Sequence, residues 1–537
     1  MRAGFFFLLS LATLAGNWGG LRDFAEGAAQ NATEWRGRTF HGNGEHTDAP
    51  RELAERFVPP GETVYYCPNS KDGSFQPAER SIHLALSWAR SPAPVRFGDK
   101  DGAGDASAII VSRFLRVDFP GYWQAAENDS AVLWRRGDMA ANAVGRARGM
   151  PPPAPWREAL GVVFVCALVS VFVWRMRLGR MESNGGGSFP RFRMPPPTAN
   201  TILTVCVAAF FMFTAAATLT HTFMAPTGLG VYGGKAKLLY LNSGIPPGFF
   251  TDPAFSSYQP AYPPGLALLT LCSYWISGGC GEWLTQLISV FAMAAALLWL
   301  GGRAVSPWAL FWVWAAFLNK QTLQMATLYY AEPFVALFVL AGWERLRSGR
   351  NDIPGWMLVG AAGFFKNEGL VFLLVLWLVL RLRPGRIAAL WRGLLAGAAL
   401  PVLWHVSCRL AGAQLYDYAP IWRVDFGQGA LALGQAFKLA FTEPWRYGFV
   451  YPLAGCAAVL ALVADRRRPG LRLSPSLGLA LAFAGLCLGA FAAIYALSAA
   501  PDFGWHLRSS LPRLLWIPAI LLLRELAAGA QDQQFSI

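Results

Sequence analysis

Charged residues are scarce in this chain of 537 residues. Only 15% are Asp, Glu, Lys or Arg, whereas 54% are hydrophobic. A soluble domain contains about 25% charged residues, so this composition excludes an ordinary soluble protein and predicts one that crosses a membrane several times. The sequence also lacks a CxxC pair and any Cys/His spacing suited to zinc. Its 8 cysteines lie mostly inside apolar runs, which predicts buried thiols rather than a disulfide framework.

The net charge of +14 is concentrated in short basic tracts beside apolar runs. These tracts lie at Arg175–Arg180, Arg345–Arg350, Arg381–Arg386 and Arg466–Arg468. Cytoplasmic loops of membrane proteins carry such an excess of Lys and Arg, so the tracts mark the cytoplasmic side. Because membrane topology accounts for the basic charge, a nucleic-acid partner is not expected.

Long apolar runs follow one another after residue 198. They lie at about 199–220, 263–277, 283–302, 304–318, 328–344, 355–381, 387–407, 446–464, 475–498 and 511–527. Runs near 20 residues match the thickness of a bilayer. They predict a mainly α fold, a polytopic transmembrane helical bundle. The sequence FFKNEG at Phe364–Gly369 interrupts one run and predicts two short legs that turn at Lys366–Glu368.

We divide the chain into four parts. These are a signal peptide or short N-terminal anchor at 1–16, an extracytoplasmic α/β domain at 17–155, a span with a basic cytoplasmic linker at 156–198, and a multi-span membrane domain at 199–537. Residues 1–16 are shorter than a full span, and the choice between cleavage and retention stays open.

The part at 17–155 is polar and rich in loops. Strand-like segments lie at Glu62–Cys67 and Ala108–Val111, and a helix is predicted around Glu79–Arg90. The sequence does not indicate what this small α/β domain binds.

The basic tracts place the polar segments 221–262 and 408–445, the approach to Glu332, and 499–510 on the outer face. One conflict remains, because three apolar runs separate Tyr262 from Glu332. If all three cross the membrane, these residues lie on opposite faces; they share a face only if one run does not cross.

Ionisable residues beside the apolar runs are the candidates for chemistry, since a charge at membrane depth is costly to keep. The acids are Glu332, Asp252 and Glu368. The substrate- or phosphate-binding candidates are Lys235, Lys237, Tyr262, Lys366, His506, Arg508 and Arg513. A carboxylate can take the proton of an acceptor hydroxyl while Lys and Arg hold a departing phosphate. The sequence contains no recognisable metal-binding motif and implies no cofactor, although an outer-face Asp/Glu pair could hold Mg²⁺ weakly.

Structural roles compete with these assignments. Lys235 and Lys237 could anchor a span end at the interface. Glu332, before Pro333, could serve merely as the cap of a helix. Lys366 could form a purely structural ion pair with Glu368.

The order of motifs resembles that of the C-type membrane glycosyltransferases (GT-C), which include the protein mannosyltransferases and the lipid A aminoarabinose transferases. The motifs are KAKLLYLNSGIP, TDPAFSSYQPAYPPG, YYAEPFVALF, FFKNEGLVFLL and SSLPRLLWIPAILLL, within residues 199–527. The resemblance implies a GT-C-like fold and the transfer of a sugar from a polyprenyl-phosphate carrier to a glycan, lipid or protein acceptor. It also implies an outer loop that contains Lys235 and Lys237, an acidic position at Glu332, and phosphate contacts at Lys366 and Arg513.

The chain departs from the family pattern before the KAK motif. Relatives usually have an Asp there as the catalytic base, and Thr227 takes its place. Threonine has no carboxylate, so either Asp252, Glu332 or Glu368 replaces that base or catalysis is lost. The resemblance implies a bacterial inner-membrane glycosyltransferase as the leading expectation. A degenerate protein that binds or moves a lipid-linked sugar is the alternative, and a solute transporter is a third.

Overall fold

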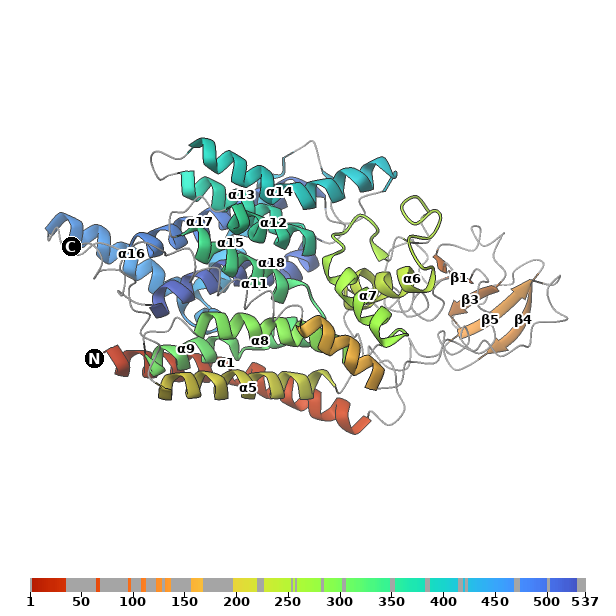
Figure 1. Ribbon diagram of the computed structural model, residues 1–537, viewed down its shortest axis with the longest axis horizontal. Coiled ribbons are helices and arrows are strands. Elements are labelled where there is room, and N and C mark those ends of the chain that lie inside the picture. Colours follow the sequence, from red (N-terminus) through yellow and green to blue (C-terminus); the bar gives the residue numbers. More distant parts are fainter. Residues whose placement is uncertain are drawn as a thin grey trace.

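The computed structural model describes the following residues: 2–34, 64–67, 95–97, 108–112, 122–127, 131–136, 156–167, 197–219, 227–252, 255, 258–281, 284–301, 306–347, 353–381, 387–413, 419–420, 424–467, 474–499 and 503–528. Most of them are helical, as the apolar runs predict (Figure 1).

The helices are α1 (Arg2–Glu34), α5 (Pro197–Thr218), η3 (Thr227–Gly234), α6 (Lys235–Leu241), α7 (Gly265–Ser277), η5 (Leu284–Gln286), α8 (Leu287–Gly301), α9 (Pro307–Phe317), α10 (Lys320–Thr327), α11 (Glu332–Leu346), α12 (Ile353–Phe365), α13 (Glu368–Arg381), α14 (Ile387–Leu410), α15 (Phe426–Phe441), η6 (Pro444–Tyr447), α16 (Val450–Arg467), α17 (Pro475–Ala496) and α18 (Phe503–Ala528). Residues 156–167 are helical as well. Each predicted apolar run coincides with one or two helices, whereas η3, α6, α10 and α15 lie outside the runs.

Three described segments are long and apolar enough to cross a membrane: Leu284–Gly301, Leu390–Leu410 and Pro475–Ala496. The pair α10 and α11 forms a fourth if it is taken as one span, although the two helices are bent by 105°. Other predicted runs form shorter apolar helices, among them α7, α9 and α12.

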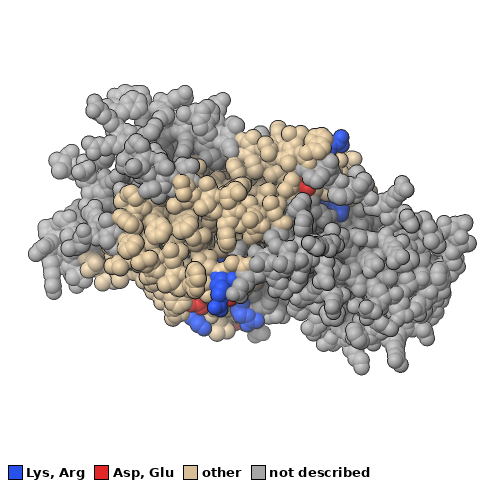
Figure 2. Space-filling model, turned by 90° about the horizontal axis from the view of Figure 1, so that it is seen from below, with Lys and Arg blue, Asp and Glu red and all other residues tan. Residues whose placement is uncertain are grey.

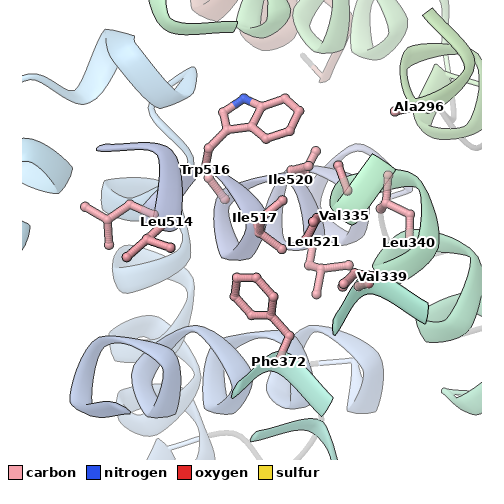
Figure 3. Packing of buried hydrophobic residues seen from close by; sticks show 14 of the residues in the cluster. Ala296, Val335, Val339, Leu340, Phe372, Leu514, Trp516, Ile517, Ile520 and Leu521 are labelled. Carbon is pink, nitrogen blue, oxygen red and sulfur yellow. The ribbon is translucent and has the colours of Figure 1, made fainter. Parts of the chain in front are cut away.

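The core surrounds α11 and α18 (Figure 3). Trp516, Ile517, Ile520 and Leu521 of α18 are buried and lie near side chains of α11 and near Phe372 of α13. Because most side chains in the later part of α18 and nearly all of α11 are buried, charged groups on the packed sides of these helices are removed from solvent.

Helix α1 continues beyond the predicted boundary at residue 16 and packs along α9. Phe7 meets Trp308 edge-to-face at 4.9 Å between ring centroids. Further along, the Asn17 amide donates to the Trp445 carbonyl at 3.0 Å. A Cβ on Gly16 would lie 2.4 Å from the Trp445 Cβ, so only glycine allows this approach. The apolar N-terminal segment is thus one part of a longer helix packed against the bundle.

The interrupted run 355–381 forms two helices, as predicted. Helix α12 ends at Phe365 and α13 begins at Glu368, with Lys366 and Asn367 between them. The helices pack on each other, and a Cβ on Gly369 would lie 2.2 Å from the backbone of Ala362. Glycine at this position therefore permits the tight turn that carries Lys366.

The position of α7 bears on the conflict between Tyr262 and Glu332, which share a face if the run 263–277 does not cross the membrane. This helix has 13 residues and packs beside α6 at the end of the bundle through Ala236, Leu239, Leu271 and Tyr274 (Figure 1). Helices α8, α9 and α10 then lie between α7 and the start of α11. We call the end of the bundle where α6 and α7 lie the α6 end.

The segment 408–445, expected to be a polar outer loop, contains a 16-residue helix. Helix α15 packs along α17, with Gly429 against Ala492 and Ala496. Its other face exposes Phe426, Leu431, Phe437 and Phe441. The prediction of a polar loop was wrong here, because small residues on one side of α15 allow close helix packing.

Residues 64–136 contribute a five-stranded sheet of β1 (Val64–Cys67), β2 (Val95–Phe97), β3 (Ala108–Ser112), β4 (Tyr122–Glu127) and β5 (Ala131–Arg136), in the order β2-β1-β3-β5-β4. Strand β1 is parallel to β2 and β3, whereas β5 is antiparallel to β3 and β4. Strands β1 and β3 coincide with the predicted strand-like segments. The helix predicted at 79–90 lies outside the described residues, so the structure does not support the α/β assignment.

A buried charge cluster joins α11 and α18 away from the α6 end. Arg524 forms ion pairs with Glu344 and Glu525, and Arg347 pairs with Glu344 at 3.1 Å. The Trp343 indole also donates to Glu525 at 2.8 Å. Two carboxylates and two guanidinium groups balance in charge. Such a closed network is tolerated in a core, but it depends on every member being present.

Candidate functional site

Glu332 is the centre of a second charge cluster, at the other ends of α11 and α18. It begins α11, directly before Pro333, and its side chain is 3% exposed. One carboxylate oxygen, Oε1, accepts from Lys366 Nζ at 3.1 Å and from Arg513 Nη1 at 2.8 Å. The Glu332 side chain therefore does more than cap its own helix, since it joins three elements distant in sequence.

The turn between α12 and α13 positions Lys366. Its ammonium group is buried and pairs with Glu332 and with Glu368, each at 3.1 Å. Glu368 is the first residue of α13, where a carboxylate is favoured by the positive end of the helix dipole. Lys366 has three N–H groups, and its contacts with the described residues use two of them, so the third is available to a ligand.

Arg513 approaches Glu332 from α18. Its Nε donates to the Ser509 carbonyl one turn earlier, at 2.9 Å, and its guanidinium lies 4.6 Å from the centre of the Tyr330 ring. Stacking on an aromatic face and the bond to Ser509 fix the plane of the guanidinium. The contacts of the described residues use Nε and Nη1, so Nη2 is left for a ligand.

Two tyrosines lie beside this cluster. Tyr232, on the π-helix η3, and Tyr262 are placed with ring centroids 6.1 Å apart and share a hydrogen bond between their side chains. Burial, together with the charge of Glu332, raises the pKa of Tyr232 well above its ordinary value. Burial also raises the pKa of Tyr262. Both phenols therefore stay neutral and act as hydrogen-bonding groups.

Two acceptor atoms of the site have no partner among the described residues. They are Oε2 of Glu332 and Oδ1 of Asn367, and both are buried. A buried acceptor without a donor is costly, so native proteins rarely leave one unless a ligand or water occupies the position. Both atoms accept hydrogen bonds, which suits a ligand with hydroxyl groups.

Lys235 is not brought to this cluster. It is buried, and its ammonium group donates to the carbonyls of Gln259 and Tyr262 at 2.9 and 3.0 Å. These bonds tie α6 to the loop before α7, where Gln259 has a positive φ of 46°. The side chain thus positions the loop that carries Tyr262 instead of reaching a phosphate among the cluster residues.

We expect Lys235→Met to alter the pH dependence of stability. Burial lowers the pKa of the Lys235 ammonium from its ordinary 10.5 to about 7. Between these values the unfolded chain holds more protons than the folded chain, so the folded state gains stability as the pH rises. The wild type should therefore gain stability relative to Lys235→Met between about pH 7 and about pH 10. Thermal unfolding of both proteins across this range measures the difference. A constant difference would contradict the assignment.

The remaining candidates lie elsewhere. Asp252 is half-buried in the turn after α6, and its amide donates to the Gly248 carbonyl at 2.8 Å. Lys237 is half-buried on α6, and Arg508 is exposed on α18. The contacts described above for the Glu332 cluster come instead from Lys366, Glu368 and Arg513. His506 is on α18, but its side chain lies outside the described part.

Metal ligands are not grouped in the part of the chain that the structure describes. No three or more His, Cys, Asp or Glu side chains there come close enough to hold an ion. Glu332 and Glu368, the two acids nearest each other in the site, share Lys366 between them. A cation already occupies the place where Mg²⁺ would be expected.

Tyr232, Tyr330 and Asn367 are site residues that the sequence did not single out as candidates. Tyr330 directly precedes Ala331-Glu332, and Asn367 lies between two candidates, so adjacency was a usable signal for both. Tyr232 had no such signal, because its place depends on how η3 folds against the 259–262 loop.

Thr227, the position of the usual Asp in relatives, begins η3. A Cβ on the next residue, Gly228, would lie 3.0 Å from the Leu328 carbonyl and 3.2 Å from the Tyr329 Cβ. The backbone at 227–228 therefore runs beside the segment that leads into Glu332.

Compared with known proteins, the chain matches no family model, no curated protein and no solved structure. The resemblance to C-type glycosyltransferases thus rests on the motifs alone.

Proposed function

We propose that the protein is a membrane glycosyltransferase that moves a sugar from a polyprenyl-phosphate carrier to an envelope glycolipid, polysaccharide or protein. The observation that carries the proposal is the Glu332 cluster. A buried carboxylate, one of whose oxygens has no partner among the described residues, lies beside two cations, Lys366 and Arg513. This combination suits proton removal and phosphate release at one point.

In the proposed reaction, the acceptor hydroxyl donates a hydrogen bond to Oε2 of Glu332. The acceptor oxygen bonds to the anomeric carbon as the bond from that carbon to the phosphate oxygen breaks. Glu332 takes the proton, and the polyprenyl phosphate leaves with the electron pair. Arg513 Nη2 and the third N–H of Lys366 stabilise the negative charge on the leaving phosphate.

The proposed location is the bacterial inner membrane, with the α6 end of the bundle and the sheet at the outer face. The basic tracts support this orientation, because Arg347 and Arg381 lie at or just beyond the ends of α11 and α13 that are remote from Glu332 and Glu368.

Purified protein in lipid nanodiscs, supplied with a panel of polyprenyl-phosphate hexoses and pentoses, tests the proposal. Consumption of one donor, dependent on an added membrane-envelope extract as acceptor, is the expected result. Failure of the folded wild type to consume any donor of the panel would contradict it.

A non-catalytic protein that binds or moves a lipid-linked sugar is the second candidate. Two observations favour it: Thr227 replaces the usual acid, and both cations of the site already contact Glu332.

Thr227→Asp distinguishes the two candidates, because residue 227 begins η3 beside the approach to Glu332. If the chain is degenerate, we expect transfer to appear only in this variant, measured with the same donor panel. If Glu332 is the working base, the wild type is active and a second carboxylate gives no gain. Thr227→Asn, which matches Asp in size without its charge, is the control.

A further inference from the structure

The hairpin formed by α13 and α14 is basic and contains no acid after its first residue. Between Gly369 and Tyr416 the sequence has five arginines but neither Asp nor Glu. The side of the bundle where α1 and α5 lie is different. Figure 2 shows that its described surface is almost wholly tan, and that its few blue atoms lie mostly in groups with red ones. The hairpin therefore carries an excess of positive charge that its own side chains do not neutralise.

Two of these arginines lie at the end of the hairpin that is remote from Glu368. Arg381 is the last residue of α13, and Arg392 lies in the second turn of α14; both are exposed. Helices α12 and α17, which pack against the hairpin, contain no acidic residue either. In the described part of the chain, Arg381 contacts the Trp377 ring and neither arginine pairs with a carboxylate. Both charges are therefore available to an anion from outside the chain.

Two tryptophans join the helices beside these arginines. Trp377 of α13 and Trp391 of α14 have ring centroids 4.5 Å apart, and the Arg381 guanidinium carbon lies 5.4 Å from the centre of the Trp377 ring. Trp377 is buried, whereas Trp391 is 46% exposed and its indole N–H has no acceptor among the described residues. Tryptophan is enriched where the hydrocarbon of a bilayer meets the headgroups. The pair therefore places Arg381 and Arg392 near the membrane surface.

Exposed aliphatic side chains continue from this level toward the middle of both helices. Leu378 and Leu374 of α13 precede Arg381 by three and seven positions, spacings that lie on one face of a helix. On α14, Leu395 follows Trp391 by four positions and is 68% exposed. The surface thus has cations and an indole at the end of the hairpin and leucines further along, which is the order of headgroup and acyl chains in a phospholipid.

We propose that the α13–α14 hairpin binds an anionic phospholipid at the end of the bundle opposite the α6 end. The guanidinium groups of Arg381 and Arg392 donate to the phosphate, and the Trp391 indole donates to a phosphate or ester oxygen. The acyl chains lie along the exposed leucines. A dissolved phosphate would gain nothing from these leucines. A zwitterionic headgroup fits less well, because its own cation finds no carboxylate on the hairpin. The site is independent of the proposed function, since it shares no residue with the Glu332 cluster.

Native mass spectrometry tests the site. The full-length protein in neutral detergent micelles is titrated with phosphatidylglycerol or with phosphatidylcholine. We expect one phosphatidylglycerol to bind more tightly than any phosphatidylcholine. Arg381→Gln with Arg392→Gln should weaken its binding about thirtyfold, because each arginine near an anionic lipid contributes about fivefold. Trp391→Leu keeps both charges and should weaken binding about fivefold, because one hydrogen-bond donor is lost.

Arg409→Gln is the matched control, because it removes an exposed arginine from the other end of α14. It should leave the binding of phosphatidylglycerol unchanged. If it weakens binding as much as Arg392→Gln, the net charge of the protein attracts the lipid and the site is overturned. Unchanged binding in the double variant, or equal binding of the two lipids, overturns it as well. Displacement of the lipid by inorganic phosphate, but not by chloride at equal ionic strength, has the same meaning, because the site then serves a dissolved anion.

Folding is checked in the same micelles without added lipid, where the variants should unfold at the temperature of the wild type. If the double variant unfolds earlier, the single variants Arg381→Gln and Arg392→Gln decide, each with an expected loss of about fivefold. Sugar transfer enters none of these measurements. Failure of the proposed function would therefore leave the lipid site standing, and loss of the lipid site would leave the Glu332 cluster untouched.

Discussion

Glu332→Gln is expected to lower sugar transfer about 10²- to 10⁴-fold, the usual contribution of a general base. The amide has nearly the shape of the carboxylate, but it cannot take the acceptor proton through Oε2. It also removes the negative charge that Lys366 and Arg513 share. The initial rate of donor consumption in nanodiscs measures the loss, and the thermal midpoint shows whether the variant still folds.

Glu368→Gln is the matched control for this prediction. It removes the other carboxylate that contacts Lys366 but leaves Glu332 with both cations. We expect a much smaller loss of rate from it. The reverse result, with Glu368→Gln inactive and Glu332→Gln nearly as active as the wild type, would assign the base to Glu368. Equal, near-wild-type rates in both variants would exclude the Glu332 cluster as the catalytic centre.

Arg524→Met is expected to lower the free energy of unfolding by about 3–5 kcal/mol. Arg524 is 1% exposed and pairs with Glu344 and Glu525 between α11 and α18. Methionine fills much of the same volume, but the two carboxylates then lose the cation that pairs with both of them and keep the longer contacts with Arg347. Unfolding of the purified protein by denaturant in mixed micelles measures the change.

Arg392→Met provides the comparison, because Arg392 is exposed on α14 and an exposed substitution changes stability by about 0.5 kcal/mol or less. Adding Glu344→Gln to Arg524→Met should recover part of the loss, since one uncompensated charge disappears. If Arg524→Met destabilises no more than Arg392→Met, the cluster does not hold α11 and α18 together.

The secondary structure could be predicted well in the membrane part because apolar run length and helix breaks are local properties. The turn at Lys366-Asn367 is an example, since a charged KNE within an apolar run can only be accommodated by a break. Helix α15 was missed because its apolar residues are interspersed with Gly and Gln. The role of α7 stayed open, because nothing in a 13-residue apolar run tells whether it crosses a membrane.

The site was partly predictable. Glu332, Lys366, Glu368 and Arg513 were found because buried charges in apolar surroundings need partners, and few candidates exist. Lys235 was found by the same reasoning, but its partners are backbone carbonyls, which have no sequence signature. Tyr232 depends on the π-helix η3 and on the loop at Tyr262, so only the packed structure places its hydroxyl near the acids.

By itself, the sequence determined that this protein is mostly helical, that its helices are apolar, and that a few charged residues lie within or beside them. Those properties follow from composition and from spacing along the chain. Only the tertiary structure decided which charges meet: α11 and α18 hold Glu332 against Arg513 at one end and Glu344 against Arg524 at the other. The reason is that ion pairing in a core depends on the distance and orientation between packed helices. Glu332 and Arg513 are 181 positions apart in the chain, and Glu344 and Arg524 are 180 apart.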